Sequence, residues 1–419
     1  MRVKKTNLIF FITIMLIIVV IIIIITVKSK DKYVDIDNSE KDLYIYDELN
    51  EIEKQKLDKQ ELDKQNKNIG CDVLVPPEDI YENINGKLKG TYFKAARFNP
   101  TRQPDGTYGY DDIYIAFMPD FDSEAIPRVY NTSSPNIGEW TCPKNGKKYL
   151  LVKSEENIGN QYGVPDGYSI LDPLEKEFIY SPISIKESIK RIVRERWQPF
   201  INMNLVFMDD DPLFDGDSDE MKIALSTIRI SFNPKGGSNS IVGKQCLLKK
   251  YENKNTMNFA WFDVKTVIHE FGHMLGMLHE HQSPLNPIPI PNDSWNEPEL
   301  YKYYDSTFIA NGILTDTSED MKKRSDWIAG NVFNTTISVD KLEGNYDMYS
   351  IMFYSFPKKV FKDGTSYKET GLRLNSILSL KDAGLAAKYY PKYNDDETPI
   401  NPNMGDIISL YKSIYEFSK

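Results

Sequence analysis

Histidine is scarce in this chain: only four of the 419 residues are histidine, and all four lie between His269 and His281. Cysteine is scarcer, since Cys71, Cys142 and Cys246 are the only three. None of them has the CxxC spacing of a cysteine zinc site, and three cysteines allow at most one intramolecular disulfide. Small secreted domains usually carry more disulfides, so the cysteine content weakly disfavours an oxidising compartment.

An excess of basic residues is also missing. The chain has 51 lysines and arginines against 61 aspartates and glutamates, which gives a formal net charge of -10 at pH 7. Proteins that bind nucleic acid usually present a basic face, so we expect no nucleic-acid partner. Hydrophobic residues make up 41% of the chain and aromatic residues 12%, which is enough for a buried core in one large domain or two.

A long apolar run occurs near the N-terminus. Residues 8–27 are apolar except for two threonines, and three basic residues lie within residues 1–6. A helix of about 20 apolar residues can span a bilayer. A cleaved secretory signal has a shorter apolar segment and a cleavage site of small residues, whereas the charged sequence KSKDK follows here at 28–32. We therefore predict an uncleaved transmembrane signal-anchor at 7–27 with residues 1–6 in the cytosol; a cleaved signal is the alternative.

Composition changes along the chain predict four further regions. Residues 28–70 are dense in charged side chains and predict a solvated stalk. Residues 71–107 form either an N-terminal region or a pro-segment, and residues 108–392 form the main domain. Proline, glycine, asparagine and serine are frequent near 119–181, which predicts long loops or an insertion within that domain. Residues 393–419 form a C-terminal tail.

The spacing of apolar residues predicts a mixture of strands and helices. Strand patterns occur at 112–118, 203–208, 228–232 and 256–261. Helical patterns occur at 185–197, 264–278, 379–390 and 406–417. We therefore expect both strands and helices in the main domain.

The histidines belong to one motif. His269, Glu270 and His273 form the pattern HExxH. Residues four apart on a helix share one face, with Cβ atoms about 5–6 Å apart, so both imidazoles can bind one metal ion. Glu270 lies beside the first ligand, where a carboxylate can take a proton from a metal-activated water during attack on a carbonyl. The pattern therefore indicates hydrolytic chemistry.

Gly276 and His279 extend the motif to HExxHxxGxxH. A helix that continued past His273 could not bring His279 to the same ion, whereas a glycine with positive φ can turn the chain. Three neutral histidine nitrogens hold zinc and leave a fourth position for water, the arrangement of a catalytic zinc site. We therefore predict one zinc ion per chain, bound by His269, His273 and His279. His281 lies outside the pattern and is predicted to be a loop histidine.

The residues around this motif resemble the astacin family of metzincin zinc peptidases. Glu280 directly follows the third histidine, as it does in astacins. Residues 346–354 resemble the astacin Met-turn. This resemblance implies that Met352 lies beneath the zinc site and that Tyr354 is a fifth zinc ligand that moves to stabilise the oxyanion. Phe353 stands where the family usually has a histidine.

The resemblance covers roughly residues 185–390 and points to the microbial or viral-type branch of the family. It implies a metzincin α+β fold of two subdomains. The upper one would hold a mixed twisted sheet and helices above the cleft, and the lower one would be rich in loops and contain the Met-turn. Residues 256–261 would be the edge strand that pairs with an extended peptide substrate. Astacins commonly hold this domain with two disulfides, which three cysteines cannot supply.

These features together predict a membrane-anchored zinc endopeptidase whose catalytic domain lies outside the cytosol, with Glu270 as general base. Two other hypotheses remain: a catalytically silent, zinc-stabilised adhesion or receptor module, and a structural membrane protein whose zinc only stabilises the fold. The control of activity is open. The resemblance implies that Glu280 anchors a new N-terminus after processing, but no clear processing site is present. Cys71 would either cap the zinc ion as a thiolate or be an unpaired cysteine.

Overall fold

The computed structural model describes two short strands before residue 96 and most of the chain from there to residue 415. The chain divides into two compact units, Met1–Leu62 and Asp63–Lys419, and all described residues lie in the second. The residues left out are 1–71, 75–91, 94–95, 120–136, 142, 144–145, 147, 154–167, 181–183, 234–236, 284–289, 291, 311–327, 334–341, 344–346, 348, 355, 366–374 and 416–419. The predicted anchor and stalk, together with Cys71 and Cys142, therefore lie outside the described residues. Within the described part, no helix is both long enough and apolar enough to cross a bilayer.

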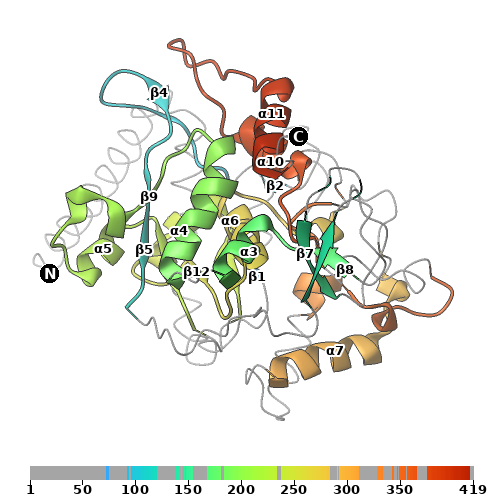
Figure 1. Ribbon diagram of the computed structural model, residues 1–419. Coiled ribbons are helices and arrows are strands. Elements are labelled where there is room, and N and C mark those ends of the chain that lie inside the picture. The colour runs from blue at the N-terminus through green and yellow to red at the C-terminus, as the bar shows by residue number, and fades with distance from the viewer. Residues whose placement is uncertain are drawn as a thin grey trace, which may run out of the picture. The chain divides into compact units, whose positions relative to one another are not determined.

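The largest sheet has six strands in the order β1-β11-β12-β10-β5-β9. Strands β9, β5, β10 and β12 run parallel to one another, β11 is antiparallel to β12, and β1 is parallel to β11. Their bounds are β1 Asp72–Leu74, β5 Ile113–Phe117, β9 Leu205–Phe207, β10 Ile228–Ser231, β11 Asn239–Ile241 and β12 Met257–Asn258. This mixed sheet, together with the helices around it (Figure 1), confirms the predicted α+β class.

The strand predictions at 112–118, 203–208 and 228–232 are confirmed by β5, β9 and β10. The prediction of an edge strand at 256–261 is wrong. Only two of these residues form β12, and β12 pairs with β10 on one side and with β11 on the other. Strand β11 (residues 239–241) pairs with the side of β12 that was predicted to be free. The edges of the sheet are β1 and β9.

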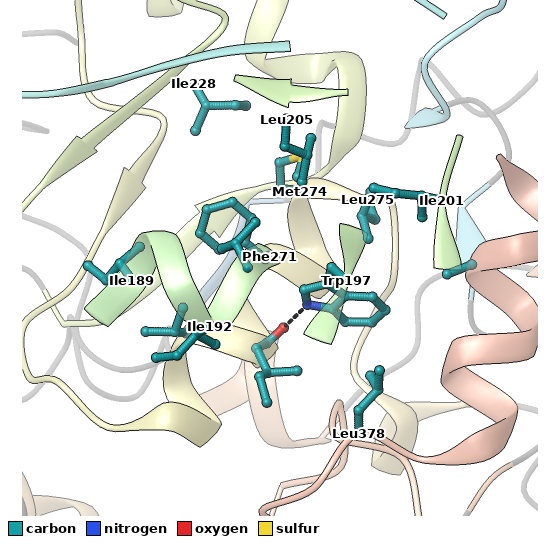
Figure 2. Close-up of a cluster of buried hydrophobic side chains, with 14 of the residues drawn as sticks. Ile189, Ile192, Trp197, Ile201, Leu205, Ile228, Phe271, Met274, Leu275 and Leu378 are labelled. Carbon is teal, nitrogen blue, oxygen red and sulfur yellow. Dashed lines mark hydrogen bonds between the residues drawn. The ribbon is translucent and has the colours of Figure 1, made fainter. Parts of the chain in front are cut away.

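Two helices pack against each other beside this sheet: α4 (Ile185–Arg196) and α6 (Val264–Met274). Trp197, at the end of α4, is fully buried, and its Nε1 donates a hydrogen bond of 2.9 Å to the carbonyl of Ile268 on α6. A buried indole N–H needs such an acceptor. We call the surrounding hydrophobic cluster the main core; Figure 2 draws part of it. It includes Ile189, Ile192, Trp197, Ile201, Leu205, Ile228, Phe271, Met274, Leu275 and Leu378.

The two C-terminal helices also contribute to the main core. Helix α10 (Leu380–Tyr389) begins with a capping box, in which Ser379 and Asp382 bond each other's backbone N–H groups. Helix α11 (Met404–Tyr415) packs against α10, and the hydroxyl of Tyr411 donates to the carbonyl of Leu378 at 2.8 Å. The helices predicted at 379–390 and 406–417 are thus confirmed, as are those at 185–197 and, up to Met274, at 264–278.

A second hydrophobic cluster, the satellite core, is built largely from aromatic side chains. Helix α7 (Glu297–Ala310) and a π-helical turn, η11 (Ala329–Phe333), contribute to it. The sequence patterns predicted neither element. The satellite core consists of Trp295, Leu300, Tyr304, Ile328, Val332, Phe353, Phe356, Val360 and Phe361, with Tyr354 packed against it.

The segment 119–181 contains more regular structure than its composition suggested. Three antiparallel strands lie there, β6 (Ile137–Thr141), β7 (Lys148–Lys153) and β8 (Tyr168–Ile170), followed by α3 (Pro173–Tyr180). The remaining elements are short: α5 Asp219–Leu225, the strand pair β2 Tyr92–Phe93 and β13 Leu342–Glu343, and the strand pair β3 Thr101–Arg102 and β4 Tyr108–Gly109.

Candidate metal centre

Helix α6 carries the first two predicted ligands. Asp263 begins the helix as its N-cap, with Oδ1 accepting the Thr266 N–H at 2.5 Å. His269 and His273 follow on one face, and their ring centroids lie 4.7 Å apart. Both rings are buried, and Glu270 between them is fully buried. The helix therefore presents two imidazoles and a carboxylate from a single buried segment.

Gly276 ends the helix in the way that the sequence predicted. Its φ is +98°, a conformation that is open to glycine at little cost. The Gly276 N–H donates to the His273 carbonyl at 2.8 Å and the Met277 N–H to the Gly272 carbonyl at 2.9 Å, the two bonds of a Schellman motif. The chain turns back at this point, and His279 reaches the two histidines of the helix.

The three histidines converge at the spacing of metal ligands. Their ligand atoms all lie within 4.8 Å of one another, and the Nε2 atoms of His273 and His279 are 3.2 Å apart. Two nitrogens bound tetrahedrally to one zinc ion at about 2.0–2.1 Å would lie about 3.3 Å apart. His269, His273 and His279 could therefore hold a metal ion, and the separation of the His273 and His279 nitrogens fits zinc.

Hydrogen bonds from the outer ring nitrogens orient two of these imidazoles. His269 Nδ1 bonds the Ile351 carbonyl at 3.0 Å, and His273 Nδ1 bonds the Met277 carbonyl at 2.8 Å. A carbonyl only accepts, so both Nδ1 atoms carry the proton and both Nε2 atoms keep a lone pair for a metal. Among the described residues, His269 Nε2 is buried without a hydrogen-bond partner. A metal ion would satisfy that atom.

Burial keeps these rings neutral, which is the form that binds metals. It lowers the pKa of His273 to about 4 and holds the pKa values of His269 and His279 well below 6.5. Neighbouring histidines lower the pKa values of His269 and His279 further. The site can thus bind a cation at neutral pH without first releasing protons from these three rings.

Met352 lies directly against the helix that carries the ligands. A Cβ placed on Gly272 would meet the Met352 sulfur at 2.5 Å, so any larger residue at this position would push the Met352 side chain away from the helix. The Met352 carbonyl also accepts the Glu280 N–H at 3.0 Å. The turn at 350–352 is thereby fixed to α6 and to the residue that follows the third histidine. Gly272 was not singled out from the sequence; its only signal is a glycine inside a helix, a position that usually costs about 1 kcal/mol.

Tyr354 lies beside the third histidine. Its ring centroid is 4.1 Å from that of His279 and 5.8 Å from that of His269. The preceding residue, Phe353, points into the satellite core instead. The structure thus brings the predicted tyrosine to the histidine cluster.

Glu280 lies at a buried junction. Its Oε1 accepts the Asp347 N–H at 2.7 Å, and its Oε2 has no hydrogen-bond partner among the described residues. Burial raises the pKa of Glu280 well above its usual value, and Asp382 and Asp347 nearby raise it further. Asp347 in turn accepts a hydrogen bond from Ser379 at 2.5 Å, which connects Glu280 to the start of α10.

Asp382 on α10 supports the opposite side of the same turn. Its carboxylate accepts the Ile351 N–H at 2.8 Å and the Ser350 hydroxyl at 2.7 Å. Ile351 is also the residue whose carbonyl orients His269. Burial raises the pKa of Asp382 to about 7. Asp382 therefore helps to orient the His269 ring, because it holds the backbone of Ile351, whose carbonyl bonds His269. The sequence did not reveal this role.

Comparison with known proteins gives limited information. No family model and no curated protein sequence matches the chain. Two solved structures of myroilysin are similar: one has a TM-score of 0.41 at 23% identity and covers 73% of this chain and 100% of its own. The other has a TM-score of 0.35 at 22% identity and covers 77% of this chain and 100% of its own. Similarity at this level does not assign a family, so the functional assignment depends on the geometry of the site itself.

Proposed function

We propose that this chain is a zinc-dependent endopeptidase of the astacin-like metzincin type. One observation carries the proposal: three buried histidines converge, two of them at zinc-ligand spacing, and Glu270 lies on the same buried helix segment directly after the first of them. A zinc ion that only stabilised the fold would usually have four protein ligands. Among the described residues, the cluster offers three.

Each residue of the site has a proposed role. His269, His273 and His279 hold the ion, which would supply Lewis acidity and lower the pKa of a water molecule to about 7. Glu270 takes a proton from the attacking water and delivers it to the leaving amine. Tyr354 donates a hydrogen bond from its phenol to the oxyanion that forms on the scissile carbonyl.

Three further residues shape the site. Gly276 supplies the turn that delivers His279, Met352 forms the floor as in a Met-turn, and Glu280 fixes the segment after the third ligand. The proposal retains the two-subdomain metzincin arrangement, a peptide or protein substrate, and a membrane anchor at 7–27 that places the catalytic domain outside the cytosol. The domain limits also remain those predicted from the sequence.

The test is Glu270→Gln in the full-length protein. Glutamine keeps the size of the side chain but cannot take the proton, so peptide cleavage should fall about 100- to 10,000-fold while one zinc per chain remains bound. Glu252→Gln, at an exposed position, is the matched control and should cleave like the wild type. Unchanged cleavage by the Glu270 variant would reject the proposed base. A wild type that cleaves no member of a broad peptide library would favour the silent adhesion or receptor module.

A further inference from the structure

The fourth histidine, His281, is part of the site although it is not one of the three converging ligands. It lies in η9 (Glu280–Gln282) and is 4% exposed. Its Nε2 bonds the backbone carbonyl of Asn331 at 3.0 Å, so Nε2 carries the ring proton. Burial lowers the pKa of His281 to about 3, and the ring is therefore neutral at physiological pH. As predicted, His281 is not one of the converging histidines, but its ring is buried and fixed in orientation.

The face of the His281 ring is in contact with Tyr354. The two rings stack with centroids 4.8 Å apart and an interplanar angle of 18°. His279 is the third ring of this group, with centroids 4.1 Å from Tyr354 and 5.5 Å from His281. Tyr354 therefore contacts one predicted ligand and one histidine that is not in the ligand cluster.

His281 is itself held by the satellite core. Phe356 meets it edge-on at 5.3 Å, and Phe356 in turn contacts Trp295 at 4.9 Å. Asn331, whose backbone carbonyl accepts the hydrogen bond from His281 Nε2, lies in the π-helical turn η11, where Val332 is buried in the same core. The position of the His281 ring is thus set by packing from one side and by a directional hydrogen bond.

We propose that His281 is a positioning residue for Tyr354: its ring is the surface against which the tyrosine is held beside His279. The inference builds on the proposed function, in which the Tyr354 phenol must lie about 2.7–3.1 Å from the developing oxyanion. A tyrosine ring can rotate about two side-chain bonds, and a stacked neighbour removes most of that freedom. His281 touches neither the substrate nor the reacting atoms and acts through Tyr354 alone.

Two substitutions separate the two features of the His281 ring. His281→Phe keeps an aromatic face but cannot bond Asn331. His281→Gln keeps a donor for Asn331 but has no ring. If stacking is the function, Phe should preserve the environment of Tyr354 and Gln should not.

The first measurement does not depend on catalysis. Tyr354 is replaced by 3-fluorotyrosine in the full-length, zinc-loaded protein, and its fluorine resonance is recorded. The resonance should stay near the wild-type position in His281→Phe and shift or broaden in His281→Gln, because the ring current of the stacked neighbour is lost. An unchanged resonance in the Gln variant would overturn the proposal even if the protein proved to have no peptidase activity.

The second measurement is a double-mutant cycle on peptide cleavage. His281→Gln should lower kcat roughly two- to ten-fold, the range expected for one aromatic pair, with KM and zinc content nearly unchanged. His281→Phe should recover most of this loss. In a Tyr354→Phe background, which lacks the phenol, His281→Gln should have no further effect. An equal loss in both backgrounds, or loss of zinc, would show a general structural role and reject the proposal.

Discussion

The main core and the satellite core hold different parts of one site. The main core carries α6, and with it His269 and His273, whose rings are fixed by a helix and by backbone carbonyls. The satellite core holds Tyr354 and His281, whose rings are fixed chiefly by other rings. Hydrogen bonds fix both the position and the direction of a ring, whereas stacking restricts its rotation but still allows a small sliding motion along the contact. The parts proposed to bind metal are thus held more tightly than the part proposed to stabilise the oxyanion.

This difference suggests that zinc binding and turnover can be separated by mutation. A change in the main core should disturb the ligands directly, because α6 is packed within it. A change in the satellite core should reach the site only through Tyr354 and His281. The following predictions test that separation, beginning with the largest effect.

Trp197→Ala and Trp295→Ala compare the two cores directly. Both side chains are fully buried, and replacing a buried tryptophan by alanine typically costs about 3–5 kcal/mol. Trp197 bonds the carbonyl of the residue before His269, so its removal should lower both the free energy of unfolding and zinc affinity. Trp295→Ala should lower kcat while zinc affinity stays closer to the wild type.

The measurements are chemical denaturation of the zinc-free protein, zinc affinity by competition with a chelator, and steady-state peptide cleavage. Equal loss of zinc affinity in the two variants would mean that both cores support the metal ligands equally. Loss of turnover without loss of zinc in Trp197→Ala would reverse the proposed division.

A smaller effect is expected at Asp382, which acts on the main-core side of the site. Asp382→Asn keeps one acceptor and loses the other, so it cannot hold both the Ile351 N–H and the Ser350 hydroxyl. Substitution of such outer partners typically lowers metal affinity about 10- to 100-fold. Tyr411→Phe is the control, because it removes a hydrogen bond to Leu378 near the same helix start and leaves Ile351 untouched. A similar drop in zinc affinity in both variants would assign the effect to α10 stability.

Local sequence patterns were sufficient to identify the three converging histidines. The two histidines of α6 are four residues apart and share a helix face, and Gly276 has the positive φ that the motif required. The main strands and helices were also predicted, since each has several apolar residues at the right spacing. These features depend on neighbours along the chain, which a sequence pattern records.

The features that were missed depend on contacts distant in sequence. His269 is oriented by Ile351, 82 residues away, and His281 by Asn331, 50 residues away. Strand β12 has only two residues, and the edge prediction failed because its partner β11 could not be identified from its own composition. The satellite core was missed because most of its aromatic residues come from short segments outside the predicted strands and helices, and because helix α7, which contributes Leu300 and Tyr304, was not predicted.

The last prediction concerns the pH dependence of the main core. Glu175 is a residue of α3. Its side chain is buried against the start of α6, where its Oε1 accepts the Val264 N–H at 2.5 Å. Burial raises the pKa of Glu175 to about 8, and Asp263 and Asp172 nearby raise it further. The folded protein therefore keeps a proton that the unfolded chain releases at its ordinary, lower pKa. The contribution of Glu175 to the free energy of unfolding should fall as the pH rises from about 5 to about 8, by at most about 1.4 kcal/mol per pH unit.

Glu175→Gln cannot ionise and lacks this contribution, so its stability relative to the wild type should increase towards pH 8. Glu177→Gln is the control, because Glu177 lies at an exposed position on α3, the helix that also carries Glu175. It should keep the wild-type dependence of the free energy of unfolding on pH. The measurement is chemical denaturation at several pH values between 5 and 8 with zinc removed, so that metal binding does not contribute. Trp295→Ala should also keep the slope, because the proton is held at α6 and not in the satellite core. A stability difference between Glu175→Gln and the wild type that does not change with pH would place the proton elsewhere and remove this distinction between the two cores.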